Sequence, residues 1–239
     1  MNFIEGDSGL AGLSLVAAAH ELKAPLVLLR QLSFQMLESS DLRANREVSQ
    51  RMQLVSERSL RLVDGLTKVA RLEDAMFQTE PIQLRGLCAE VLNEISPLAY
   101  TLNRKISLKI SRKVPAVVAN KDLLHGLLVN LLDNSLQYSN DNDNEIELSA
   151  RISRSRAQIS VKDSGKLDLK EFRQLRKKLG KQAQPVSDQP LSSGLGLFIA
   201  GEFARAMDGE LTVSRHKKGG LTFSANLPIS HQLSLFGEN

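Results

Sequence analysis

Two long helix-favouring runs fill the first part of the chain, with the polar stretch ESSDLRAN (residues 38–45) between them. Residues 11–38 contain Gly12 and Pro25 as their only glycine and proline. The second run carries apolar residues at steps of three, four and seven, which share one helix face: Met52, Val55, Leu62, Leu66, Val69 and Leu72. We therefore expect an antiparallel helical hairpin at 11–74. Because a lone hairpin buries little surface, the pattern predicts a homodimer built on a four-helix bundle.

The hydrophobic pattern changes after residue 80. Alternation of apolar and polar residues predicts strands in KISLKI (105–110), EIELSARI (145–152), AQISV (157–161) and LTFSANL (221–227). Helical patterns occupy 84–102, 121–138 and 195–207. The segment 164–193 is polar and basic and predicts a long loop containing a helix. The whole pattern predicts an α+β fold, in which an α/β sandwich at 81–228 follows the hairpin and a tail occupies 229–239.

Composition excludes several classes of protein. The net charge is +4 and the pI about 9.2, but aromatic residues are 4% and tryptophan is absent, so we expect no direct nucleic-acid partner. No apolar run approaches the roughly 20 residues that span a bilayer, and we expect no membrane segment in this chain. The single cysteine, Cys88, forms no internal disulfide, which indicates a reducing cytoplasm. Its apolar neighbours predict a core position.

Four short motifs follow one another in the chain: HELKAPL (20–26), NLLDNSLQYS (130–139), VKDSG (161–165) and SSGLGLFIAGEFA (192–204). Each is weak alone, since an exposed histidine, an asparagine pair and a glycine turn are common. Together they suit binding of a nucleotide.

The chemistry of the last three motifs is complementary. Asn134 offers an amide oxygen to Mg²⁺, and Asn130 lies one helical turn before it on the same face. Asp163 follows a strand and suits a hydrogen bond from an adenine amino group. Gly194 and Gly196 allow backbone N–H groups to approach phosphates at the N-terminus of a helix.

This ordered set resembles the catalytic core of two-component sensor histidine kinases, over about residues 11–228. The resemblance implies a dimerisation and phosphotransfer hairpin followed by a Bergerat-type ATP-binding domain, with ATP and Mg²⁺ as cofactors. It implies that His20 accepts the phosphoryl group and that Glu21 takes or orients its proton. A response-regulator receiver domain would accept the phosphoryl group next.

The same resemblance assigns the nucleotide contacts. Asn134 would be the Mg²⁺ ligand, supported by Asn130, and Tyr138 would lie against the nucleotide. Asp163 and Gly165 form the first glycine box, with Asp163 contacting adenine and Thr222 assisting it. Gly194 and Gly196 form the second glycine box.

Four positions depart from the family pattern. Leu167 replaces the second glycine of the first box, Ser192 replaces the first glycine of the second box, and Gln137 replaces a frequent lysine. These changes leave open the alternative of a catalytically impaired pseudokinase that acts as a dimeric adaptor. Ala24, one turn after His20, replaces a threonine or asparagine that orients water, so we expect weak phosphatase activity toward the regulator.

The tail HQLSLFGEN contains a pentapeptide that resembles the motif by which bacterial proteins bind the replication sliding clamp. The residues that would make this contact are Gln232, Leu233, Leu235 and Phe236. Chance occurrence, with the apolar residues packed on the domain, is the competing explanation. The clamp is therefore a candidate partner.

Overall fold

The structure is a computed structural model that describes residues 15–72, 77–111, 114–139, 145–153, 155–179, 194–216 and 220–230. Within the first helix, the side chains of residues 15–17, 20 and 21 lie outside this description.

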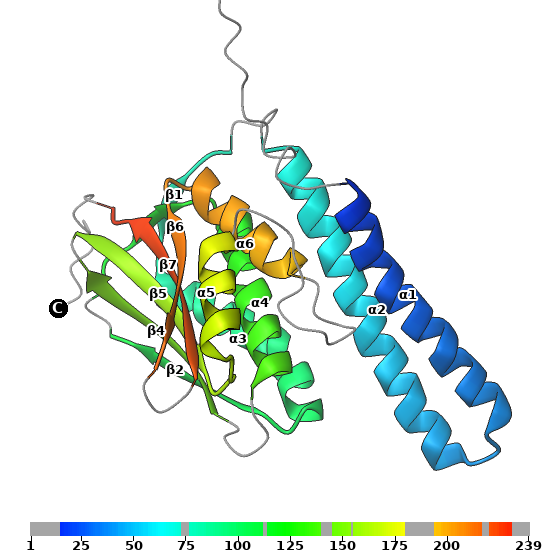
Figure 1. The fold of residues 1–239 in the computed structure, drawn as a ribbon. Helices are drawn as coiled ribbons and strands as arrows, with labels where there is room; N and C mark the ends of the chain where they lie inside the picture. The colour runs from blue at the N-terminus through cyan, green and yellow to red at the C-terminus, as the bar shows by residue number, and fades with distance from the viewer. Residues whose placement is uncertain are drawn as a thin grey trace, which may run out of the picture.

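The N-terminal part is a helical hairpin of α1 (Leu15–Glu38) and α2 (Leu42–Ala70), which lie side by side (Figure 1). Asp41 caps α2, since its Oδ1 accepts a hydrogen bond of 2.8 Å from the Arg43 backbone N–H. The cap starts α2 at Leu42, so the connection is shorter than the polar stretch predicted as a break. Residues 42–45 of that stretch form the first helical turn.

The rest of the described chain forms a sheet with helices packed on one face (Figure 1). Its helices are α3 (Leu84–Thr101), α4 (Lys121–Tyr138), α5 (Leu169–Lys178) and α6 (Leu195–Ala206). Its strands are β1 (Glu80–Ile82), β2 (Lys105–Ile110), β3 (Val117–Ala119), β4 (Glu145–Ser153), β5 (Arg156–Asp163), β6 (Glu210–Arg215) and β7 (Leu221–Pro228). The main sheet has the order β2-β4-β5-β7-β6, with β2 and β4 parallel and the other pairs antiparallel. A separate antiparallel pair joins β1 to β3. The predicted α+β fold, a helical hairpin followed by an α/β sandwich, is confirmed.

The core lies between the sheet and its helices. Alternate residues of β4 and β5 face it, including Ile146, Leu148, Ile159 and Val161, all fully buried. Cys88 of α3 is also fully buried, as predicted, and burial raises the pKa of its thiol to about 12. The thiol is therefore protonated at neutral pH.

Part of the apolar stripe on α2 faces the α/β sandwich. Leu62 and Val69 are 6% and 2% exposed and belong to the same hydrophobic cluster as the sandwich core. Helix α2 packs against α6 (Figure 1). Two residues of the stripe predicted for the hairpin thus also hold the hairpin to the sandwich.

Candidate functional site

One cavity of about 440 Å³ brings together four of the predicted site residues: Asn134, Tyr138, Asp163 and Gly165. It lies between the C-terminal part of α4, the end of β5 and helix α5. Apolar side chains from α5, α6 and β7 complete its wall: Leu175, Leu197, Leu221 and Phe223. Polar and charged side chains form most of the rest of the lining, among them Arg104, Gln137, Ser139, Lys166 and Glu171. A cavity of this size is typical of a small-molecule site.

Asp163 is the most buried polar group of the cavity, with 4% of its surface exposed. Its Oδ2 accepts a hydrogen bond of 2.8 Å from the Ser135 hydroxyl, and its Oδ1 accepts one of 2.9 Å from the Gly165 N–H. Burial raises the pKa of the Asp163 carboxyl, and these hydrogen bonds oppose the rise. The carboxyl is thus buried and held in one orientation.

The raised pKa of Asp163 predicts a pH-dependent stability. A folded-state pKa above the unfolded value of 3.8 means that the folded chain binds this proton more tightly. The stabilisation is complete below 3.8 and is lost as the pH rises through the folded-state pKa. We expect the free energy of unfolding of Asp163→Asn, relative to the parent chain, to increase as the pH rises from about 4 to about 8, by at most about 1.4 kcal/mol per pH unit. Urea titrations of both proteins across this range measure the difference; a constant difference would contradict the prediction.

Two glycines allow the backbone to close around Asp163. A β-carbon at Gly165 would lie 2.9 Å from Asp163 Oδ1 and 3.1 Å from the Tyr138 carbonyl oxygen. Gly220, the residue directly before β7, has a φ of 93°. A β-carbon there would lie 2.5 Å from the Asp163 carbonyl oxygen. Both positions therefore require glycine for the observed geometry.

The N-terminus of α6 lies beside α4, near the predicted magnesium ligand. Gly194 is the N-cap of α6 with a φ of 60°, a left-handed conformation that favours glycine. A β-carbon at Gly196 would lie 3.3 Å from Asn130 Oδ1, while Asn130 Nδ2 donates to the Gly126 carbonyl at 2.9 Å. Asn130 and the two glycines are not among the lining residues of the cavity, but Asn130 lies against Gly196, one helical turn before Asn134.

Thr222 lies elsewhere. Its hydroxyl is 2.6 Å from Nε2 of His216, and the cavity is lined instead by its neighbours Leu221 and Phe223. The alternation along β7 explains this, because successive side chains point to opposite faces of the sheet. The same alternation in LTFSANL was the available signal that Leu221 and Phe223, rather than Thr222, face the helices.

Most of the other cavity residues were not assigned to the site from sequence, and three of them make informative contacts. Arg104 follows α3, and its guanidinium donates to the Ser139 carbonyl at 2.8 Å. Leu167, at the position of the missing glycine, lines the cavity and packs against the core. Gln137 also lines it and donates to Asp133 Oδ2 at 2.8 Å. Only Gln137 and Leu167 carried a sequence signal, as departures from the family pattern.

Some predicted residues are not described by the structure. His20 and Glu21 belong to α1, but their side chains lie outside the description. Ser192 and the four tail residues of the clamp-binding motif lie outside the described residues. The roles of these residues stay predictions.

Comparison with known proteins agrees with this geometry. Residues 119–231 match the family described as histidine kinase-, DNA gyrase B-, and HSP90-like ATPases. The sensor protein CutS of Streptomyces coelicolor is 27% identical over 223 residues, which are 89% of this chain and 51% of CutS. The chain is homologous to sensor histidine kinases. It spans about half the length of CutS.

Solved structures of histidine kinases share the fold. The Acinetobacter baumannii histidine kinase AdeS superposes with a TM-score of 0.61 at 16% identity, over 89% of this chain and 98% of AdeS. Full-length ShkA, in complex with AMPPNP, gives 0.60 at 22% identity, over 90% of this chain and 45% of ShkA. These structures show the fold, and together with the sequence matches they confirm the resemblance to the histidine kinase catalytic core. Within the part of the chain that the structure describes, no helix is both long enough and apolar enough to cross a membrane.

Proposed function

We propose that this histidine kinase homologue phosphorylates its own His20 from Mg-ATP. The observation that carries the proposal is the cavity that gathers Asn134, Tyr138, Asp163 and Gly165 next to the N-terminus of α6. A buried, oriented carboxyl and a nearby helix N-terminus suit the base and the phosphates of an adenine nucleotide.

Different residues contact the base, the phosphates and the metal ion of Mg-ATP. The oriented Asp163 carboxyl accepts a hydrogen bond from the adenine amino group, and Leu221 and Phe223 contact the base. The backbone N–H groups that follow Gly194 face the phosphates, which the positive end of the α6 dipole attracts. The amide oxygen of Asn134 suits Mg²⁺, whose charge neutralises the phosphate oxygens when it is bound.

The phosphoryl transfer is a nucleophilic displacement. A ring nitrogen of His20 forms a bond to the γ-phosphorus of ATP while the bond from that phosphorus to the bridging oxygen breaks, so ADP leaves. Glu21 accepts the ring proton or keeps the attacking nitrogen free of it. The product is a phosphohistidine.

We propose two protein partners, a second copy of the chain and a response regulator. The hairpin exposes large apolar side chains, with Phe34 55% and Leu37 81% exposed, and these are surfaces that a second hairpin would cover. They lie on both helices: Leu26, Phe34, Leu37, Leu42, Leu60 and Val63.

An aspartate of the regulator then receives the phosphoryl group from His20. Since the Ala24 side chain has no donor or acceptor to orient water, we propose that phosphatase activity toward the phosphorylated regulator is weak. The single reduced cysteine supports a cytoplasmic location.

Incubation with γ-labelled ATP and Mg²⁺ tests the kinase activity. We expect acid-labile, base-stable label on the parent chain and none on His20→Gln. The Asn134→Ala variant should also lose the label, because Mg²⁺ loses its protein ligand. An unlabelled parent chain that still binds ATP would reject the kinase and favour the dimeric adaptor.

A further inference from the structure

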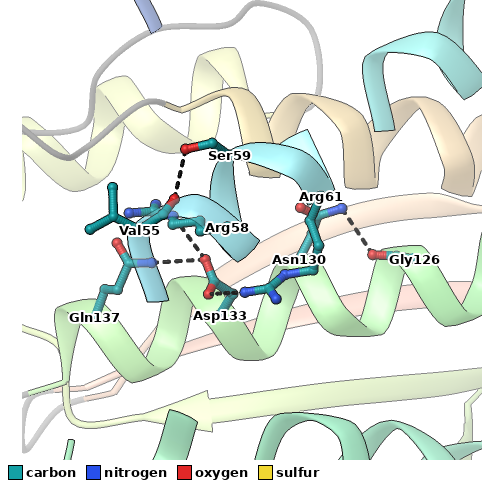
Figure 2. A network of polar contacts seen from close by, with 8 residues as sticks. All are labelled: Val55, Arg58, Ser59, Arg61, Gly126, Asn130, Asp133 and Gln137. Carbon is teal, nitrogen blue, oxygen red and sulfur yellow. Dashed lines mark hydrogen bonds and ion pairs between the residues drawn. The ribbon is translucent and has the colours of Figure 1, made fainter. Parts of the chain in front are cut away.

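A polar network joins the hairpin to α4, the helix that carries Asn134 and Tyr138 of the candidate site. Asp133 of α4 lies between Arg58 and Arg61 of α2 (Figure 2). Its Oδ2 is 3.1 Å from Arg58 Nε, and its Oδ1 is 3.4 Å from an amino nitrogen of Arg61. The Arg58 contact is ionic, since its Nε forms no hydrogen bond with a described residue. The Asp133 side chain is 12% exposed, so solvent screens this charge less than it screens a surface ion pair.

An apolar contact continues the same face of α2. Gly65 follows Arg58 and Arg61 by seven and four residues, so the three positions share one face of the helix. A β-carbon at Gly65 would lie 2.9 Å from Cδ1 of Ile199 on α6. A glycine inside a 29-residue helix costs about 1 kcal/mol relative to alanine. The close approach of Ile199 explains why glycine stands there.

These contacts occur level with the predicted phosphoacceptor. The connection between α1 and α2 spans residues 39–41, so an antiparallel pair of equal rise sets residue 60 opposite residue 20. Arg58 and Arg61 bracket that level. The network therefore holds Asp133, the residue before Asn134, beside the part of α2 that lies opposite His20.

Gln137 connects the network to the cavity. Its side chain lines the cavity and donates to the Asp133 oxygen that faces Arg58 (Figure 2). A nucleotide bound in the cavity would cover Gln137, and its hydrogen bond to Asp133 would strengthen where water is excluded. That bond fixes the Asp133 carboxylate toward the two arginines.

We propose that Arg58, Arg61, Asp133 and Gln137 are positioning residues that couple nucleotide binding to docking of the α/β sandwich on α2. The docked arrangement presents the nucleotide at the level of His20. The kinetic consequence rests on the proposed kinase activity, whereas the docking and its response to nucleotide do not.

Disulfide trapping of Gly65→Cys with Ile199→Cys measures docking without any phosphorylation. The β-carbon at position 65 lies 3.1 Å and 3.6 Å from the two γ-carbons of Ile199, which brings the two β-carbons to a disulfide distance. The native Cys88 thiol is buried and has a pKa of about 12, so it should not react in this cross-linking assay. We expect AMPPNP to speed cross-linking by about fivefold or more. Adding Gln137→Ala should remove this acceleration, and adding Asp133→Asn should slow cross-linking with and without nucleotide.

The matched control is Glu90→Gln, which breaks an exposed ion pair with Lys121 inside the sandwich and should leave cross-linking unchanged. Without the engineered cysteines, Asp133→Asn and the double variant Arg58→Gln/Arg61→Gln should lower autophosphorylation at saturating ATP by about ten- to a hundredfold, because displaced reactants react slowly. Because the coupling between docking and binding is reciprocal, the Kd for ATP should rise by no more than the factor by which AMPPNP speeds cross-linking.

The outcomes separate the two proposals. Cross-linking that is insensitive to Asp133→Asn and to AMPPNP would overturn the coupling. Slower cross-linking with unchanged or faster autophosphorylation would overturn the positioning role and indicate a restraining contact. If the parent chain is never labelled, the kinase proposal fails, while the cross-linking still decides whether nucleotide controls docking.

Discussion

Replacing Asp163 with asparagine is expected to weaken ATP binding by about 100-fold, or about 2.7 kcal/mol. The carboxyl is 4% exposed and its two oxygens are already oriented by Ser135 and Gly165. An adenine amino group meets a buried acceptor that needs no rearrangement before it accepts a hydrogen bond. The asparagine amide turns a donor toward one of these partners or toward the base. One buried group then lacks its hydrogen bond.

Isothermal titration with ATP and with ADP measures the loss. Both nucleotides should lose affinity equally, because Asp163 meets the base and not the phosphates. Asn134→Ala is the matched comparison: without Mg²⁺ its affinity should stay near that of the parent chain, and with Mg²⁺ it should fall below it. An Asp163→Asn variant that binds ATP as tightly as the parent would remove Asp163 from the adenine site.

Elements with a strong local pattern were predictable from the sequence. Helix α4 was predicted at 121–138 and is found there, because Asn120 caps it, accepting a hydrogen bond from the Leu123 N–H at 3.1 Å. The alternating strands were also found near their predicted positions. In contrast, β1 and β3 are three residues long, which is too short for a periodic signal. They form because they pair with each other.

The cavity was predictable where one motif supplies neighbouring residues, and less so elsewhere. Asn134 and Tyr138 are four apart on one helix, so their common face follows from helical geometry. Arg104 reaches the cavity from after α3, and nothing in its local sequence indicates the contact with Ser139. The network around Asp133 has the same origin. Arg58 and Arg61 resemble the other arginines of α2, and only the packing of distant segments selects them.

Gly220→Ala is expected to destabilise the fold by about 2–4 kcal/mol and to lower the thermal midpoint by about 10 °C. The backbone φ of 93° is one that L side chains rarely adopt. The new β-carbon would also lie 2.5 Å from the Asp163 carbonyl oxygen, which is backbone and has little freedom to move. Thermal unfolding followed by circular dichroism measures the change. Gly86→Ala is the matched control: beyond its own helix backbone and chain neighbours, no atom of the described residues lies within 4 Å of its β-carbon, so stability should stay or rise by up to about 1 kcal/mol.

Comparing two glycine positions distinguishes a loss of fold stability from a loss of ATP binding. At Gly220 the strain falls on Asp163, so ATP affinity should decrease even well below the unfolding temperature. Gly209→Ala places its β-carbon 2.5 Å from Leu227 Cδ2 and 2.9 Å from the Ala204 carbonyl oxygen, at the opposite end of the β6–β7 pair. That variant should lose stability yet bind ATP like the parent chain at low temperature. Equal ATP affinity for both glycine variants would contradict the placement of adenine at Asp163.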